Sequence, residues 1–149
     1  AAPARFRELI LEAFHYSKIK KRSMDFFHTM ISDPDSVGER AAAALERDHG
    51  AGWRGVLERN AAAWIEIAKT GPGDLYDGKL SELKPPVLFI DGERDPRTEP
   101  GDLEAVRRAL PCAEMRMIEG AGHSPHSEPA HAAECTRLAS DFLRRAAGP

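Results

Sequence analysis

The stretch from Pro85 to His126 constrains the fold of this chain most strongly, because it holds two strand-like segments around one helical segment. The segment Val87–Asp91 is apolar up to Ile90 and is followed by Gly92, which predicts a strand covered on both faces of a parallel sheet. A second buried strand is predicted at about Glu114–Ile118, and about Glu99–Leu110 has the apolar spacing of a helix between the two. The sequence therefore predicts two parallel strands joined by a crossover helix.

Two polar residues follow these strands. Asp95 comes after the first strand, and His123 follows the glycine-rich turn Gly120-Ala121-Gly122 after the second. Parallel strands joined by a right-handed crossover end at one edge of the sheet, which is where open α/β folds bind ligands. We therefore expect Asp95 and His123 to emerge together at this edge.

A carboxylate paired with an imidazole has a defined chemical use. A catalytic imidazole must be held in one tautomer with its other nitrogen aimed at the reacting group, and a hydrogen-bonded carboxylate does both. Asp95 and His123 are the candidate catalytic residues on this ground. Other interpretations stay open: Asp95 caps a turn before Pro96, His123 is an ordinary loop histidine, or Asp91 at the strand end is the acid.

From about Asp74 to Arg145 the chain resembles the C-terminal portion of the α/β-hydrolases. That family carries its acid in a G-x-x-D segment after the penultimate strand, matched here by Gly92-Glu93-Arg94-Asp95. It carries its base in a G-H pair after the last strand, matched by Gly122-His123, and it closes with a helix, matched by Pro129–Arg145. The family's nucleophile motif G-x-S-x-G does not occur in this sequence.

The resemblance implies an α/β fold, namely the C-terminal half of an α/β-hydrolase fold preceded by a helical cap. It also implies hydrolysis of a small ester, amide or related bond in a small-molecule substrate, with no metal or organic cofactor. In a nucleophile–His–acid triad, His123 would be the general base and Asp95 the acid that orients it. The nucleophile precedes both in the family's chain order, so it is expected upstream of Ala1.

Two parallel strands leave open edges and uncovered faces, so they do not form a stable sheet alone. We therefore expect the partner of this chain to be the N-terminal half of the hydrolase core, in the same or a separate chain, and the isolated chain to be inactive. One alternative is an enzyme of the same fold with other chemistry, such as a dehalogenase or a haloperoxidase-like enzyme. The other is a non-catalytic binding or assembly half-domain.

The residues before Gly71 have helical periodicity, which predicts a helical subdomain over residues 1–73 and the α/β part over residues 74–149. Helices are expected at about Ala4–Lys20, Ser23–Ser32 and Trp53–Lys69, with a further one ending near His49. The hydrolase family commonly inserts a helical cap at this place, so the resemblance implies that the first part of the chain is a cap.

A cap would supply part of the substrate site. Some of its large apolar side chains would then form an apolar wall, and the candidates are Phe26, Phe27, Met30 and Trp64. The simpler interpretation is that these side chains form the core of the helical subdomain. Three histidines of this part are expected at surface or cap-lining positions: His15, His28 and His49.

Composition excludes several classes of partner. The net charge of −3, with both signs interspersed, argues against nucleic acid. No apolar run approaches the roughly 20 residues of a membrane helix, so no membrane is expected. The 2 cysteines lack metal-ligand spacing and fit a reducing cytoplasm. His123, His126 and His131 span a loop and a helix start, which would rarely gather all three, so no metal site is predicted.

Overall fold

The computed structural model describes residues 6–146, which form two compact units. Residues 6–16 and 74–146 make up an α/β unit, and Ser17–Gly73 makes up a helical unit. The helical unit thus begins at Ser17, whereas the sequence predicted a helical subdomain from residue 1. Residues 1–5 and 147–149, which belong to the predicted ranges, lie outside the described part of the chain.

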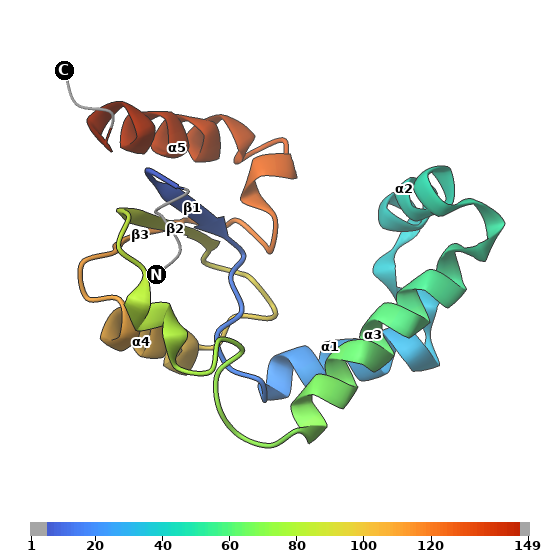
Figure 1. Ribbon diagram of the computed structural model, residues 1–149. Helices are drawn as coiled ribbons and strands as arrows, with labels where there is room; N and C mark the ends of the chain where they lie inside the picture. Colours follow the sequence, from blue (N-terminus) through green and yellow to red (C-terminus); the bar gives the residue numbers. More distant parts are fainter. Residues whose placement is uncertain (1–5, 147–149) are drawn as a thin grey trace. The chain divides into compact units, whose positions relative to one another are not determined.

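The α/β unit is built on a parallel three-stranded sheet of β1 (Leu9–Glu12), β2 (Val87–Gly92) and β3 (Glu114–Ile118), with β2 in the centre (Figure 1). Every residue of β2 is buried, as expected for a strand with a neighbour on each side and a helix on each face. β3 is only half-buried, with Arg116 and Met117 exposed. The prediction of a buried strand is therefore confirmed for β2 and wrong for β3.

β1 corrects the predicted helix at about Ala4–Lys20, of which the first two residues lie outside the described part of the chain. β1 pairs with β2 from Leu9 opposite Val87 onward, and Ala13, with a φ of 52°, follows its last residue. A short apolar run such as Leu9–Leu11 fits a helix face or a buried strand equally well, so periodicity alone does not separate the two. The edge of β2 supplies the hydrogen-bonding partner that favours the strand.

Two helices cover the two faces of the sheet. α4 (Pro100–Ala109) lies on one face and α5 (Ala132–Ala146) on the other (Figure 1). The buried side chains between the sheet and α5 are Leu88, Ile90, Ile118, Ala121, Cys135 and Phe142. Those on the α4 side are Leu80, Val87, Phe89, Val106 and Leu110. Alternate residues of β2 thus enter opposite cores, which is the period-two pattern of a central strand.

α4 is the crossover helix that the sequence predicted between β2 and β3. It begins with a capping box, in which the side chains of Glu99 and Asp102 each accept a backbone N–H of the other. Val106 on its buried face and Leu110, which follows its last residue, pack against the sheet. After α4 the chain therefore enters the sheet again at the end where β2 begins, and β3 runs parallel to β2.

The helical unit consists of α1 (Lys21–Ser32), α2 (Glu39–His49) and α3 (Trp53–Lys69). α1 and α3 pack side by side, and their shared core contains Phe27, Met30 and Ala61 (Figure 1). Short 3₁₀ turns lie in this unit at Pro34–Val37 and Gly50–Gly52, and in the α/β unit at Lys79–Glu82 and Pro125–Ser127.

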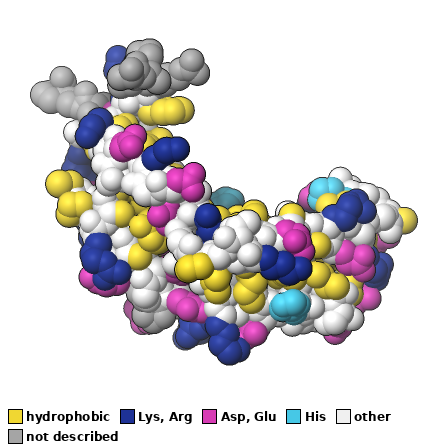
Figure 2. Space-filling model, turned by 60° about the horizontal axis from the view of Figure 1, so that its bottom comes forward, with side chains coloured by type: hydrophobic (Ala, Val, Ile, Leu, Met, Phe, Trp, Pro, Cys, Tyr) yellow, Lys and Arg dark blue, Asp and Glu magenta, His cyan; other side chains and the backbone are white. Residues whose placement is uncertain are grey.

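The face shown in Figure 2 carries acidic and basic side chains interspersed with one another, with apolar side chains between them. Many of the ion pairs join neighbours on one helix, such as Lys21 with Asp25, and exposed pairs of this kind contribute little to stability. Stability of each unit therefore depends chiefly on its apolar clusters. Among the helices within residues 6–146, none combines the length and apolar character needed to cross a membrane.

Candidate active site

Asp95 and His123 meet beyond the C-terminal ends of β2 and β3. A hydrogen bond of 2.8 Å joins His123 Nδ1 to Asp95 Oδ2. The Asp95 side chain is 1% exposed and the His123 side chain is 23% exposed. A buried carboxylate thus lies behind an imidazole that reaches the surface.

The Asp95 carboxylate is held by its own turn. Its Oδ1 accepts the Arg97 N–H (2.8 Å), and its Oδ2 accepts the Thr98 hydroxyl (2.9 Å) in addition to His123. The side chain therefore caps its turn and binds the imidazole at the same time, so these two interpretations of Asp95 are compatible. The competing acid, Asp91, is buried within β2.

The orientation of the imidazole decides which nitrogen is available for chemistry. Because Asp95 engages Nδ1, Nε2 is the nitrogen that can exchange a proton with a reacting group. The Asp95 end of the pair is shielded from water, because its side chain is 1% exposed. The pKa of the neighbouring Arg97 guanidinium lies below its usual value, since burial outweighs the opposing effect of the Asp95 carboxylate. A low-dielectric setting strengthens a carboxylate–imidazole hydrogen bond relative to water.

The end of β2 approaches the segment before His123 too closely for any side chain at Gly92. A Cβ at this position would lie 1.9 Å from Gly122 O and 2.5 Å from Ala121 O. Two backbone hydrogen bonds hold the contact together, one from Glu93 to Ile118 (3.0 Å) and one from Arg94 to Ala121 (2.8 Å). The glycine of the G-x-x-D segment therefore lets the turn that carries the acid pack directly against the chain that carries the histidine.

His15 is a third polar residue at this site, whereas the sequence predicted it at a surface or cap-lining position of the helical part. It follows β1 and lies edge-on to His123, with ring centroids 5.8 Å apart and an interplanar angle of 67°. Its carbonyl accepts the Tyr76 hydroxyl at 2.9 Å, and burial, together with the nearby Asp74 carboxylate, raises the pKa of that phenol. Assigning β1 as a strand would have placed His15 at the same sheet edge as Asp95.

The four predicted substrate contacts lie in one apolar cluster of the helical unit. Phe27 and Met30 are buried in its core, whereas Phe26 and Trp64 are half-buried. The Phe27 ring stacks on Trp64 with centroids 5.9 Å apart and meets Phe26 edge-on at 5.6 Å. The cluster provides the core of the helical unit, and substrate contact by these residues stays a prediction.

Two of the three histidines that follow the last strand pair with different carboxylates. His123 bonds Asp95, whereas the exposed His126 pairs with Glu12 at the end of β1, with 2.8 Å between Nδ1 and Oε2. His131 lies near the start of α5 and is half-buried. Within residues 6–146, no group of three or more histidine, cysteine or acidic side chains is arranged to hold a metal ion.

Comparison with known proteins places much of the chain in a family. Residues 55–149 match the model of the TAP-like protein family of α/β-hydrolases. That range covers the end of the helical unit and the whole segment that carries Asp95 and His123. No curated protein matches the chain.

Solved structures share the fold at low sequence identity. A thermophilic esterase from Thermogutta terrifontis is 23% identical, with a TM-score of 0.57, over 95% of this chain and 57% of its own. NosK from Streptomyces actuosus is 21% identical, with a TM-score of 0.60, over 97% of this chain and 61% of its own. An E-2-(acetamidomethylene)succinate hydrolase is 16% identical, with a TM-score of 0.59, over 96% of this chain and 59% of its own. The chain thus spans about three fifths of the length of these structures.

Proposed function

Because the chain belongs to the TAP-like family of α/β-hydrolases, we propose that it carries the acid and the base of an enzyme that hydrolyses a small ester, amide or related bond. The observation that carries this proposal is the 2.8 Å hydrogen bond between the buried Asp95 carboxylate and the partly exposed His123 imidazole. The acid precedes the histidine along the chain, as in the triads of this superfamily.

In the proposed reaction His123 acts as the general base and then as the general acid. Its Nε2 takes the proton of a serine-type nucleophile while the nucleophile's oxygen attacks the carbonyl carbon of the substrate. The same proton then passes to the leaving group as the bond to that group breaks. Water repeats the sequence on the acyl intermediate and releases the acid product. Asp95 keeps the proton on Nδ1 and stabilises the imidazolium that forms in each half of the reaction.

The nucleophile of this proposal comes from outside residues 1–149. The sequence contains no G-x-S-x-G motif, and the triad order puts the nucleophile before the acid. The longer chains of the solved structures support a further core segment. That segment would also supply the backbone amides that stabilise the developing oxyanion.

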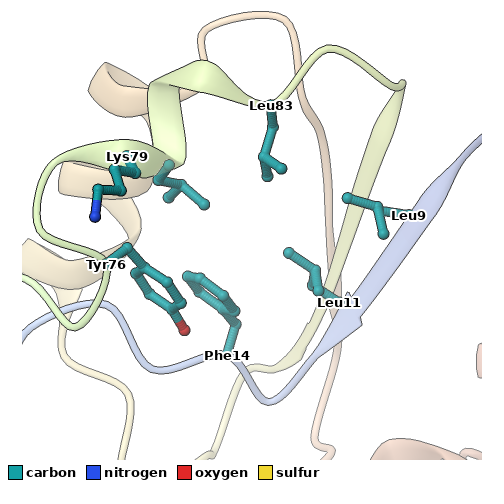
Figure 3. A pocket seen from close by; sticks show the side chains of 7 residues that line it. Leu9, Leu11, Phe14, Tyr76, Lys79 and Leu83 are labelled. Atoms are coloured by element: carbon teal, nitrogen blue, oxygen red, sulfur yellow. The ribbon is translucent and has the colours of Figure 1, made fainter. Parts of the chain in front are cut away.

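The outer edge of β1 is where we expect this segment to dock. Within the described sheet β1 pairs only with β2, so its other edge presents backbone groups to a further strand. Beside β1 lies a hollow of about 420 Å³ with a largely apolar lining (Figure 3). Its lining residues are Leu9, Leu11, Phe14, Tyr76, Lys79, Leu80 and Leu83. A strand on β1 and an apolar element in the hollow would complete the core on this side.

The isolated chain is predicted to be inactive. We expect residues 1–149 alone to hydrolyse p-nitrophenyl acetate no faster than buffer, and the complete protein to turn it over, because only the latter contains the nucleophile. Steady-state rates of both preparations check this, with circular dichroism and native mass spectrometry to establish folding and stoichiometry. Turnover by the isolated chain at the rate of the complete protein would contradict the proposal. A stable homodimer of an inactive chain would favour the assembly-module alternative.

A further inference from the structure

The loop that carries His123 is held by acidic side chains at every second backbone amide. This histidine loop, residues 120–126, connects the end of β3 to the segment before α5. Its amides donate to carboxylates as follows: Gly120 to Glu93 (3.0 Å), Gly122 to Glu128 (2.9 Å), Ser124 to Glu128 (3.2 Å) and His126 to Glu12 (2.9 Å). The three acids come from different parts of the α/β unit, so the loop is fixed from several sides.

Glu128 has the central place in this arrangement. Its two oxygens accept the amides of Gly122 and Ser124, which are the residues immediately before and after His123. Hydrogen bonds from amides to an ionised carboxylate are stronger than those between neutral groups. The contact is also close, because a Cβ at Gly122 would lie 2.9 Å from Glu128 Oε1.

The backbone of Glu128 is itself anchored. Its carbonyl accepts the amides of His131 (2.9 Å) and Ala132 (2.8 Å), which lie at the start of α5. α5 in turn is fixed to the sheet through the buried side chains of Cys135 and Phe142. A rigid helix therefore sets the position of the Glu128 carboxylate, and the carboxylate sets the backbone on both sides of His123.

We infer that Glu128 is a positioning residue for the His123 imidazole. It binds the backbone on either side of His123, whereas Asp95 binds the ring at Nδ1. Both the backbone and the ring of this histidine are therefore held by carboxylates. The inference rests on the proposed function, because position matters most where Nε2 must reach a nucleophile and a leaving group. A displacement of about 1 Å in a catalytic group can cost about 100-fold in rate.

The test is Glu128→Gln in the complete protein, compared with Glu119→Gln. Glutamine keeps the shape of the side chain but replaces one accepting oxygen by a donating NH₂, so one of the two loop amides loses its acceptor. Glu119 is an exposed glutamate just after β3, and its replacement makes the same change in charge. We expect Glu128→Gln to lower kcat on p-nitrophenyl acetate by about tenfold with KM nearly unchanged, and Glu119→Gln to leave both unchanged.

A second readout does not depend on turnover. The ¹⁵N-labelled His123 ring can be followed by NMR, and we expect its Nδ1 proton to exchange with water several times faster in Glu128→Gln than in the parent protein or in Glu119→Gln. An unchanged kcat and an unchanged exchange rate would overturn the inference. So would equal losses in kcat and exchange protection for both variants, because that would indicate a general charge effect.

The failure of this inference can be told apart from failure of the proposed function. If His123→Ala abolishes turnover while Glu128→Gln changes neither kcat nor the exchange rate, only the role of Glu128 is wrong. If His123→Ala leaves turnover intact, the proposed function is wrong whatever Glu128→Gln does. The NMR comparison then still reports whether Glu128 fixes the ring.

Discussion

Replacing His123 by alanine in the complete protein is expected to lower kcat for a small ester by about 10⁴-fold or more, because the proposed reaction loses the group that carries the proton in both half-reactions. KM should change little, since the imidazole acts mainly in the transition state. Initial rates with p-nitrophenyl acetate at saturating and limiting concentrations measure the two parameters separately.

The matched control is His49→Ala. His49 is an exposed histidine at the end of α2, so its removal tests the general effect of losing one imidazole. We expect the control to keep the parent kcat, with circular dichroism showing that both variants are folded. A folded His123→Ala protein with the parent kcat would rule out the proposed base.

Replacing Gly92 by alanine should be the most damaging small change in the α/β unit. The new methyl group would meet backbone atoms of Ala121 and Gly122 at distances down to 1.9 Å, and backbone atoms cannot move aside as a flexible side chain does. The histidine loop would therefore shift away from Asp95. We expect a loss of about 100-fold or more in kcat and about 3 kcal/mol in the free energy of unfolding, measured by steady-state rates and urea denaturation.

Gly101→Ala provides the comparison for this prediction. Gly101 is an exposed residue in the first turn of α4, and a Cβ there meets no atom within 4 Å. Alanine favours a helix over glycine by about 0.5–1 kcal/mol, so this variant should be as stable as the parent or slightly more so, with unchanged kcat. Equal behaviour of the two alanine variants would show that the close approach at Gly92 does not control the site.

The sequence predicted the part of the fold where several signals agree. An apolar run ended by glycine, a helix with one apolar face and a second strand gave the β2–α4–β3 unit, and the structure confirms it. The resemblance carried by Gly92-Glu93-Arg94-Asp95 and Gly122-His123 predicted the hydrolase family and fold class, which the family match and the solved structures confirm. The catalytic roles of Asp95 and His123 stay predictions.

The parts that sequence reasoning missed depend on contacts between distant segments. β1 was predicted as a helix because its short apolar run fits the periodicity of a helix as well as that of a strand. Only its pairing with β2 distinguishes the strand from the helix. The place of His15 was predicted wrongly for the same reason, since its position beside His123 depends on β1 being a strand. Gly92 was read as the end of a strand, whereas its main role is to admit the backbone of Ala121 and Gly122.

The bonds around the histidine loop were beyond sequence reasoning for another reason. Glu12, Glu93 and Glu128 lie in three separate segments and look like ordinary surface acids in the sequence. Their common property is that each accepts backbone amides of one loop, which no periodicity or motif encodes. Features of this kind become visible only when the loop conformation is known.

The central claim, that Asp95 and His123 are the acid and the base of a hydrolase, is tested most directly by labelling the complete protein with a fluorophosphonate. Peptide mass spectrometry then locates the adduct in the parent, His123→Ala and His49→Ala proteins. We predict a single adduct on a residue outside residues 1–149, present in the parent and in His49→Ala and absent from His123→Ala. Labelling that is unaffected by His123→Ala, or no labelling of the parent protein at all, would contradict the account.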